Sequence, residues 1–283
     1  MKYSVLMTVY KNDNADYFYI ALNSMVQQTI KPDEIVIVKD GPIPNLLEQV
    51  IVNVQNSCDI YFNEIQLPNN VGLGEALNAG LKECRNDLIA RMDADDYSMP
   101  ERCEKQLRAF EQNPRLTIVS CPVEEFVDEL SNVIGYRSLP LTNSDIYSFA
   151  KRRDPFNHPS TMYRKSKVLE VGGYGNYRKN QDTDLWIRLL SNNVECLNLS
   201  EPLLKFRFDE GTYKKRKSWI NTKILIKLRY RAWRSGFNSF VDFFIVAVAQ
   251  LLVSILPVKL LRNLYRFLLR SKEKNYNGDR AGH

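Results

Sequence analysis

The segment Leu88-Ile89-Ala90-Arg91-Met92-Asp93-Ala94-Asp95-Asp96 places three carboxylates within four positions at the end of an apolar stretch. Carboxylates this close repel one another strongly where solvent is excluded. A divalent cation that carries a phosphate would relieve this repulsion, because hard cations take oxygen ligands. The alternative is a polar turn that caps the next helix, with Asp96 or Ser98 as the N-cap and Pro100 in the first turn.

Around this segment, apolar runs typical of buried strands alternate with stretches that have helical spacing. The expected strands span 3–10, 34–38, 60–67 and 87–92, and the expected helices span 15–29, 43–56 and 74–85. This alternation predicts an α/β fold with a mostly parallel sheet and helices on both faces. Ligands of such sheets bind beyond the carboxyl ends of the strands. We therefore expect one crevice to collect the residues at those ends, which are Thr8, Tyr10, Asp40 and Asp93 to Asp96.

The second half of the chain continues with mixed elements. We expect a helix over 101–113, strand segments over 116–138, strand character over 157–163 and a helix over 182–192. The length of 283 residues suits one large domain with an appendage. We place the main domain at 1–213, with halves at 1–100 and 101–213, and a C-terminal region at 214–283.

The cysteines indicate the cellular compartment. The five cysteines are scattered, and no two form a C-x-x-C pair. This pattern is typical of reduced thiols and argues against a disulfide framework or a zinc site. The chain starts with a short strand-like run and not with the long apolar segment of a signal peptide. We therefore expect a cytoplasmic protein.

The C-terminal region is much more basic than the rest of the chain. Residues 214–274 hold 15 Lys and Arg against 2 Asp and Glu, a net charge of +13, whereas the remainder carries −7. Apolar residues interleave with cations over 219–234, an apolar run covers 240–258, and a basic amphipathic piece spans 259–274. The apolar run contains Asp242 and is just short of the about 20 residues that a spanning helix needs. We therefore expect helices that lie on an anionic membrane surface.

Other partners of this region were weighed as well. A helical hairpin packed on the main domain, or a contact in a homodimer, is the alternative to a membrane surface. Nucleic acid is a poor partner, because the basic residues accompany a long apolar run and do not line a polar groove.

Blocks in a fixed order carry a resemblance to a known family. They are Met7 to Asn12, Ser24 to Thr29, Pro32 to Gly41, Asn69 to Gly72 with Ala76 to Gly80, Ala90 to Asp96, His158 to Met162 and Gln181 to Trp186. Together they resemble family 2 glycosyltransferases over roughly residues 3–210, and bacterial enzymes of exopolysaccharide and O-antigen synthesis in particular. The resemblance implies a GT-A fold with a Rossmann-like sheet, whose nucleotide-binding half is 1–100 and whose acceptor-binding half is 101–213.

The resemblance also implies an activity and its partners. It implies transfer of a sugar with inversion, from a nucleotide-sugar donor such as a UDP-sugar and with a divalent cation, Mn²⁺ or Mg²⁺. The expected acceptor is an undecaprenyl-diphosphate-linked glycan. The expected location is the inner face of the cell membrane, with peripheral attachment.

Donor contacts are expected from the blocks of the first half. The residues concerned are Thr8, Tyr10, Asp40, Asn70, Gly72, Gly74, Arg91, Asp93 and Ala94. In the family, the carboxylate at the position of Asp40 accepts a hydrogen bond from the uracil N–H. Each residue also has an ordinary structural role open to it: strand-end packing for Thr8 and Tyr10, a turn for Asp40 and the glycines, and an ion pair for Arg91.

Asp95 is the first metal ligand we expect, and Asp93 and His158 are the others. The resemblance implies that Asp93 faces the ribose and Asp95 the metal. Asp96 either ligates the metal or caps the next helix. A phosphate contact through an imidazole nitrogen is the other functional role open to His158. A structural role is equally open, because a lone histidine near a strand is commonly structural.

Asp182 is the candidate general base, because a base must reach the proton of the acceptor hydroxyl. Relatives commonly carry Glu-Asp where this chain has Gln181-Asp182, and an amide cannot act as a base. Asp184 and Trp186 are expected at the acceptor side. The alternatives are an acidic first helical turn for the two aspartates and core packing for Trp186.

Two other function classes remain open at this point. A sugar nucleotidyltransferase also uses carboxylates and a metal on a parallel sheet, but residues 7–14 lack the Gly-rich phosphate loop that such an enzyme would show. A non-catalytic nucleotide-sugar-binding assembly protein could keep the fold without using a base.

Overall fold

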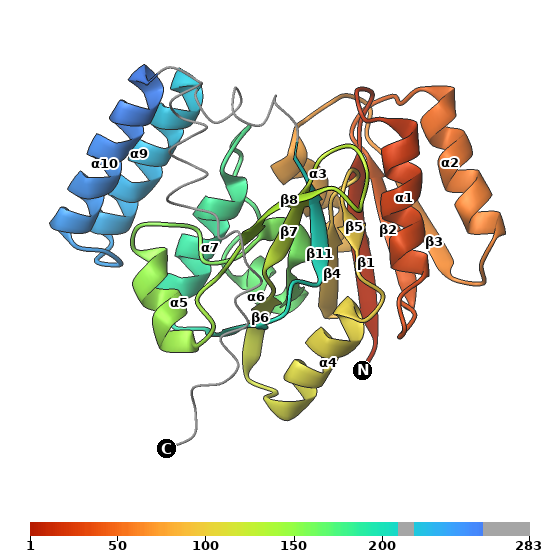
Figure 1. The fold of residues 1–283 in the computed structure, drawn as a ribbon, viewed down its shortest axis with the longest axis horizontal. Helices are drawn as coiled ribbons and strands as arrows, with labels where there is room; N and C mark the ends of the chain where they lie inside the picture. Colours follow the sequence, from red (N-terminus) through yellow and green to blue (C-terminus); the bar gives the residue numbers. More distant parts are fainter. Residues whose placement is uncertain (209–217, 257–283) are drawn as a thin grey trace.

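The structure is a computed structural model that describes residues 1–208 and 218–256. A seven-stranded sheet forms its centre (Figure 1). In spatial order its strands are β10 (Glu195–Asn198), β6 (Leu116–Ser120), β9 (Met162–Arg164), β4 (Leu88–Met92), β1 (Tyr3–Val9), β2 (Glu34–Lys39) and β3 (Tyr61–Gln66). All neighbours pair in parallel except β9, which runs antiparallel to β4 and β6. The predicted α/β fold with a mostly parallel sheet is confirmed.

Helices cover both faces of this sheet (Figure 1). One face packs against α1 (Ala15–Val26), α2 (Asn45–Asn56) and α4 (Arg102–Gln112). The other face packs against α3 (Leu73–Glu83), α5 (Asn143–Ala150), α6 (Lys165–Glu170) and α7 (Gln181–Ser191).

The sequence of β1 explains this two-sided core. Val5 and Met7 pack with the first set of helices and Leu6 with the second, because successive strand side chains point to opposite faces. All three are fully buried, and each such burial contributes about 1.5–3 kcal/mol. A strand covered on both faces requires a nearly continuous apolar run, and in residues 3–10 only Ser4 and Thr8 interrupt it.

Strand register aligns the carboxyl ends that carry the expected site. Val9 of β1 pairs with Lys39 of β2, and Met7 pairs with Met92 of β4. Tyr10, Asp40 and Asp93 therefore follow strands that end at the same edge of the sheet.

A smaller sheet lies beside this edge. It consists of β5 (Tyr97–Ser98), β11 (Leu204–Arg207), β7 (Val123–Phe126) and β8 (Val133–Arg137), in that order. Its first strand, β5, begins directly after the three aspartates, and β11 pairs with it antiparallel. A late segment of the chain is thereby brought against the carboxylates.

The predicted elements are present with shifts of one to three residues at most boundaries, but some segments differ. The strands β5, β10 and β11 were not predicted. Residues 157–163 are not one strand, since the 3-10 turn η1 (His158–Ser160) precedes β9. The helices α5 and α6 were not predicted. Both are short, with eight and six residues, so their apolar spacing is too brief to recognise.

The C-terminal region forms a helical hairpin of α9 (Trp219–Arg234) and α10 (Phe240–Ile255) beside α7 (Figure 1). Asn180 donates to Asn221 at 2.9 Å, and Arg152 forms an ion pair with Asp242 at 2.6 Å. The alternative of a hairpin packed on the main domain therefore describes these helices. Among the described residues, no helix combines the length and apolarity that crossing a bilayer requires. The boundary at 213 and the amphipathic piece at 259–274 lie outside the described residues.

Candidate active site

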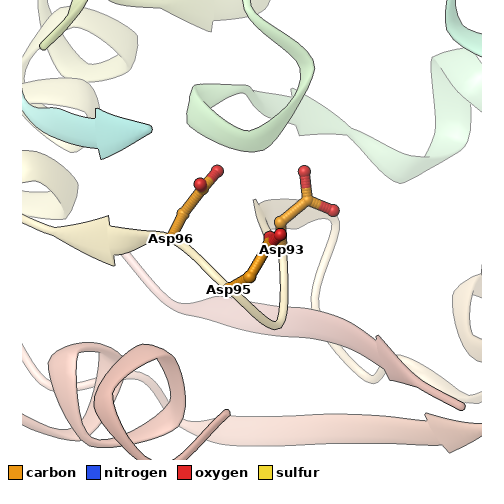
Figure 2. Close-up of side chains that lie close together, drawn as sticks. All are labelled: Asp93, Asp95 and Asp96. Atoms are coloured by element: carbon orange, nitrogen blue, oxygen red, sulfur yellow. The ribbon is translucent and has the colours of Figure 1, made fainter. Parts of the chain in front are cut away.

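Three carboxylates lie together in the turn between β4 and β5, on Asp93, Asp95 and Asp96 (Figure 2). One ligand oxygen from each lies within 4.8 Å of the others. Asp96 is buried; its Oδ1 accepts the backbone N–H of Arg207 at 2.8 Å, whereas its Oδ2 has no hydrogen-bond partner. Burial, followed by the charges of Asp95 and Asp93, raises the pKa of Asp96 well above its usual value.

This set of oxygens fits a divalent cation. A buried carboxylate oxygen without a partner is costly, and hard cations such as Mg²⁺ and Mn²⁺ take carboxylate oxygens as ligands. Within residues 1–208 and 218–256, this is also the one group of three or more potential metal-binding side chains at such spacing.

The turn does not cap the following helix. The N-cap position of α4 is Glu101, and its side chain makes no capping hydrogen bond. Asp96 binds the backbone of Arg207 instead, and Ser98 Oγ accepts from Gln28 Nε2 at 3.0 Å. The prediction that Asp96 or Ser98 caps α4 is therefore wrong, because both side chains bond to segments distant in sequence.

Arg91 supplies positive charge to the cluster. It is 1% exposed and forms an ion pair with Asp93. Its Nε and Nη1 atoms are buried without hydrogen-bond partners. The ion pair that was one of the two roles expected for Arg91 is present, and two of its nitrogen atoms remain unsatisfied.

His158 lies outside the carboxylate cluster. Its Nε2 is 2.9 Å from the hydroxyl of Tyr174, which donates to the hydroxyl of Tyr163 at 3.2 Å. Burial, and then the charge of Arg91, hold the pKa of His158 well below its usual value, so the imidazole is neutral. Its ring packs edge-on against Trp186. The expected role as a third metal ligand finds no support in this geometry, which makes His158 part of a buried polar network.

Asp40 organises the loop before α3. Its Oδ1 accepts from the backbone N–H of Val71 at 2.7 Å, and its Oδ2 accepts from Gly72 N–H at 3.0 Å and Asn70 Nδ2 at 2.9 Å. Gly72 has a φ of +94°, a conformation that side chains rarely adopt. Three residues expected at the donor side are thus brought into direct contact.

The remaining donor-side residues lie at the same edge or next to it. A Cβ on Gly74 would meet the carbonyl oxygen of Gly175 at 2.8 Å, so close packing on the loop before α7 requires a glycine there. Tyr10 is 39% exposed at the end of β1, and Thr8 is half-buried. Ala94 lies in the turn between Asp93 and Asp95. Their contacts with a donor stay predictions.

Asp182 lies half-buried in the first turn of α7 and accepts the backbone N–H of Thr183 at 2.9 Å. Burial, followed by the charge of Asp154, raises the pKa of Asp182 to about 6, and the charge of Arg91 opposes the increase. A carboxylate with such a pKa suits a general base that works near neutral pH.

The two residues expected at the acceptor side have packing roles. Asp184 accepts from Arg188 at 2.6 Å, and Arg188 also donates to the carbonyl of Gly173 at 2.7 Å. Trp186 is 1% exposed and packs against Phe156 with ring centroids 5.2 Å apart. Core packing, the alternative given for Trp186, is therefore what the structure has, and acceptor contacts of the two side chains stay predictions.

Sequence reasoning missed two charged residues at this site. Arg207 is buried in β11 and donates from Nε to the carbonyl of Asp95 at 2.9 Å. Asp154 accepts from the Thr183 hydroxyl at 2.9 Å. The segment 203–208 alternates apolar residues with the cations Lys205 and Arg207, which was a usable signal for Arg207, whereas Asp154 follows three cations and resembles an ordinary solvated charge run.

Curated proteins are similar to this chain in sequence. An amylovoran biosynthesis glycosyltransferase of Erwinia amylovora is 34% identical over 93% of this chain and 97% of its own length. A UDP-Gal:alpha-D-GlcNAc-diphosphoundecaprenol beta-1,3-galactosyltransferase of Escherichia coli is 34% identical over 95% of this chain and 97% of its own.

Two solved structures share the fold. S. aureus TarS 1-349 in complex with UDP-GlcNAc has a TM-score of 0.63 at 17% identity, covering 94% of this chain and 73% of its own. A mannosyltransferase of Pyrobaculum calidifontis with GDP-Man and Mn²⁺ has a TM-score of 0.62 at 13% identity, covering 93% of this chain and 78% of its own. These likenesses confirm the GT-A fold.

The model of the family "Glycosyl transferase family 2" matches residues 4–173, which is more than half of the chain. The resemblance drawn from the ordered blocks is confirmed, and the nucleotidyltransferase alternative is set aside: this chain belongs to glycosyl transferase family 2 and is a glycosyltransferase.

Proposed function

We propose that this glycosyltransferase moves a sugar, with inversion and in the presence of a divalent cation, from a UDP-sugar to a lipid-linked glycan of a bacterial surface polysaccharide. The observation that carries this proposal is the cluster of three carboxylates, Asp93, Asp95 and Asp96, directly after β4. Arg91 pairs with Asp93 of the carboxylate cluster, and its charge also acts on Asp182. The printed activity of the Escherichia coli relative supports a UDP-sugar and a diphosphoundecaprenol-linked acceptor.

Asp182 would act as the base. Its carboxylate takes the proton of an acceptor hydroxyl while that oxygen attacks the anomeric carbon. The new glycosidic bond forms as the bond from the anomeric carbon to the diphosphate oxygen breaks on the opposite side, which inverts the configuration. A pKa of about 6 leaves Asp182 mostly ionised at neutral pH and still basic enough to hold the proton in the transition state.

Asp93, Asp95 and Asp96 would hold the cation, Mg²⁺ or Mn²⁺. When bound, the ion would offset the negative charge that develops on the departing nucleoside diphosphate. The unpartnered Oδ2 of Asp96 supports this assignment, because a metal ion would satisfy it. The mannosyltransferase of similar fold was solved with Mn²⁺, which supports a metal in this fold.

The loop held by Asp40 would contact the nucleotide. Asp40 accepts three hydrogen bonds from that loop, and a carboxylate has about four acceptor sites, so Oδ1 keeps room for a base N–H. Tyr10 is exposed beside it and offers a ring for stacking. Contacts of Thr8, Gly74 and Ala94 with the donor belong to the same proposal.

The hairpin would attach the protein to the inner face of the cell membrane. Eight large apolar side chains of α10 are exposed and recur at helical spacing, namely Phe240, Val241, Phe244, Ile245, Val248, Leu251, Leu252 and Ile255. Lys223 and Lys227 are exposed on α9. An apolar face with cations on the neighbouring helix fits an anionic lipid surface. Such attachment would bring the site to a lipid-linked acceptor.

A screen of nucleotide sugars, with released UDP or GDP as the signal and Mg²⁺ or Mn²⁺ present, tests the activity. We expect UDP release to require the cation and to increase when a lipid-linked glycan is supplied. In Asp182→Asn, turnover should fall by about 10²-fold or more while UDP binding persists. Full transfer by Asp182→Asn would refute the base, and donor binding without turnover in the wild type would favour a non-catalytic assembly protein.

A further inference from the structure

The hairpin reaches the surroundings of the candidate base through one buried cation. Arg229 of α9 is 3% exposed, and its Nη2 lies 3.4 Å from Asp154 Oδ1. Its Nη1 donates to the carbonyl of Ala150 at the end of α5, and its Nε is buried without a partner. A guanidinium withdrawn from water with so few partners is costly. The orientation of the Arg229 guanidinium toward Asp154 therefore calls for an explanation beyond the packing of α9.

Thr183 links the partner of Arg229 to Asp182. The Thr183 hydroxyl donates to Asp154 Oδ2 at 2.9 Å, and its backbone N–H donates to Asp182 Oδ1 at 2.9 Å. Thr183 is 1% exposed, whereas the Asp154 side chain is 39% exposed, so the two bonds are partly shielded from water. Two carboxylates from distant parts of the chain are thus held on one residue of α7.

Resting on the proposed function, in which Asp182 is the base, we propose that Arg229 is a positioning residue of the transfer reaction. It holds Asp154 against Thr183 and compensates the charge of Asp154 beside Asp182. The α9 helix is then part of the active site as well as of the hairpin.

The charges around Asp182 fix the direction of the expected effects. Asp154 faces it from the loop after α5, Arg91 from β4, and the Tyr174 hydroxyl from the loop after α6. The negative charge of Asp154 favours the protonated form of Asp182, and Arg91 opposes this. Arg229, as the partner of Asp154, weakens the field of that carboxylate at Asp182.

Opposite pH shifts distinguish this role from a purely structural one. In Arg229→Met, the acid limb of the kcat/KM profile should move to higher pH by roughly half a unit, because Asp154 is left uncompensated. In Asp154→Asn, which keeps an acceptor for Thr183, the limb should move to lower pH. The double variant should follow Asp154→Asn, because Arg229 then has no charge to compensate.

Two further variants serve as controls. Arg229→Lys keeps the charge and should restore the wild-type limb. Arg231→Met removes a neighbouring α9 cation that bonds to the Tyr177 hydroxyl, and it should leave the limb in place. Equal limbs in wild type, Arg229→Met and Asp154→Asn, or shifts in the same direction, would overturn the proposal.

A second measurement separates this inference from the proposed function. The carboxyl ¹³C resonance of Asp182 in labelled full-length protein reports its titration without any turnover. Absence of transfer by the wild type with every donor would count against the proposed function. An Asp182 resonance that titrates identically in wild type and in Asp154→Asn would count against the inference alone. If Arg229→Met does not fold, the sign of the shift in Asp154→Asn and the behaviour of Arg229→Lys still decide it.

Discussion

The buried guanidinium of Arg91 forms an ion pair with Asp93, whose carboxylate is partly exposed at the end of β4. Two of its nitrogen atoms lack partners, and three carboxylates crowd the turn that follows. Arg91 therefore compensates part of the negative charge of this cluster.

Arg91→Met removes this charge with little change in side-chain length. We expect the free energy of unfolding to fall by about 3 kcal/mol, because an acidic cluster loses its buried partner. We also expect Mn²⁺ to raise the Tm of the variant more than that of the wild type. Thermal unfolding with and without MnCl₂ measures both effects. Arg115→Met, which removes an exposed ion pair with Glu195, is the control and should change neither the free energy of unfolding nor the effect of Mn²⁺ on the Tm. An equal increase of the Tm by Mn²⁺ in wild type and Arg91→Met would contradict the prediction.

The raised pKa of Asp182 predicts that the stability of the fold depends on pH. This pKa is raised to about 6 from 3.8, so the folded state binds the proton more tightly than the unfolded state. The resulting stabilisation is fully present below pH 3.8 and is lost as the pH rises through 6. Asp182→Asn cannot ionise and should therefore be more stable than the wild type at pH 8, by about 2–3 kcal/mol, with a smaller advantage of about 1 kcal/mol at pH 4.5.

Urea unfolding of wild type and Asp182→Asn at the two pH values measures this difference. The exposed Asp59, substituted by Asn, is the matched control and should follow the wild type at both. A gain at pH 8 accompanied by loss of turnover would mean that this carboxylate is kept at a cost in stability for its chemistry. An identical difference at both pH values would contradict the raised pKa.

Asp96→Asn tests the metal assignment without disturbing the backbone. The amide oxygen can still accept the N–H of Arg207, so the fold should persist. The substitution removes the charge that burial and two neighbouring carboxylates disfavour, and apo stability should not fall. Isothermal titration with UDP and Mn²⁺ should give at least about tenfold weaker binding, because a ligand oxygen has been replaced. Unchanged binding would remove Asp96 from the ligand set.

Local patterns made the sheet and its edge predictable. The strand at 3–10 is recognisable from its own apolar residues, and the aspartates after Met92 from their place directly after such a run. Both signals are properties of short segments of sequence. The site was predictable where the chemistry sits directly after a strand, as for Asp40 and Asp93.

The remaining roles at the site could not be predicted, because they depend on contacts between residues distant in sequence. The partner of Asp96 is Arg207, 111 positions away, so local capping rules gave the wrong role. The partners of His158 and of Asp154 come from separate segments, Tyr174 and Thr183, which only the folded chain brings together. Contacts of this kind are invisible to spacing, and they decide which side chains have room to bind a ligand.

The exposed apolar face of α10 predicts binding to a membrane surface. Phe244 and Leu252 are 57% and 56% exposed and lie two turns apart on that face. Their replacement by Asp should abolish flotation of the full-length protein with vesicles that contain anionic lipid, because charged groups do not enter the acyl region without a large cost. Leu46→Asp, at a 66% exposed position of α2 on the far side of the molecule, is the control (Figure 1).

The dependence of binding on salt and on lipid charge distinguishes the contribution of the α9 lysines from that of the apolar α10 face. Lys223→Gln with Lys227→Gln should weaken vesicle binding mainly at low ionic strength, since cations near anionic lipid contribute about 1 kcal/mol each and are screened by salt. Neutral vesicles should bind the wild type less than anionic ones. If Phe244→Asp with Leu252→Asp leaves flotation unchanged but converts a dimer to a monomer in solution, the face is a contact between two copies of the chain, and the membrane proposal is wrong.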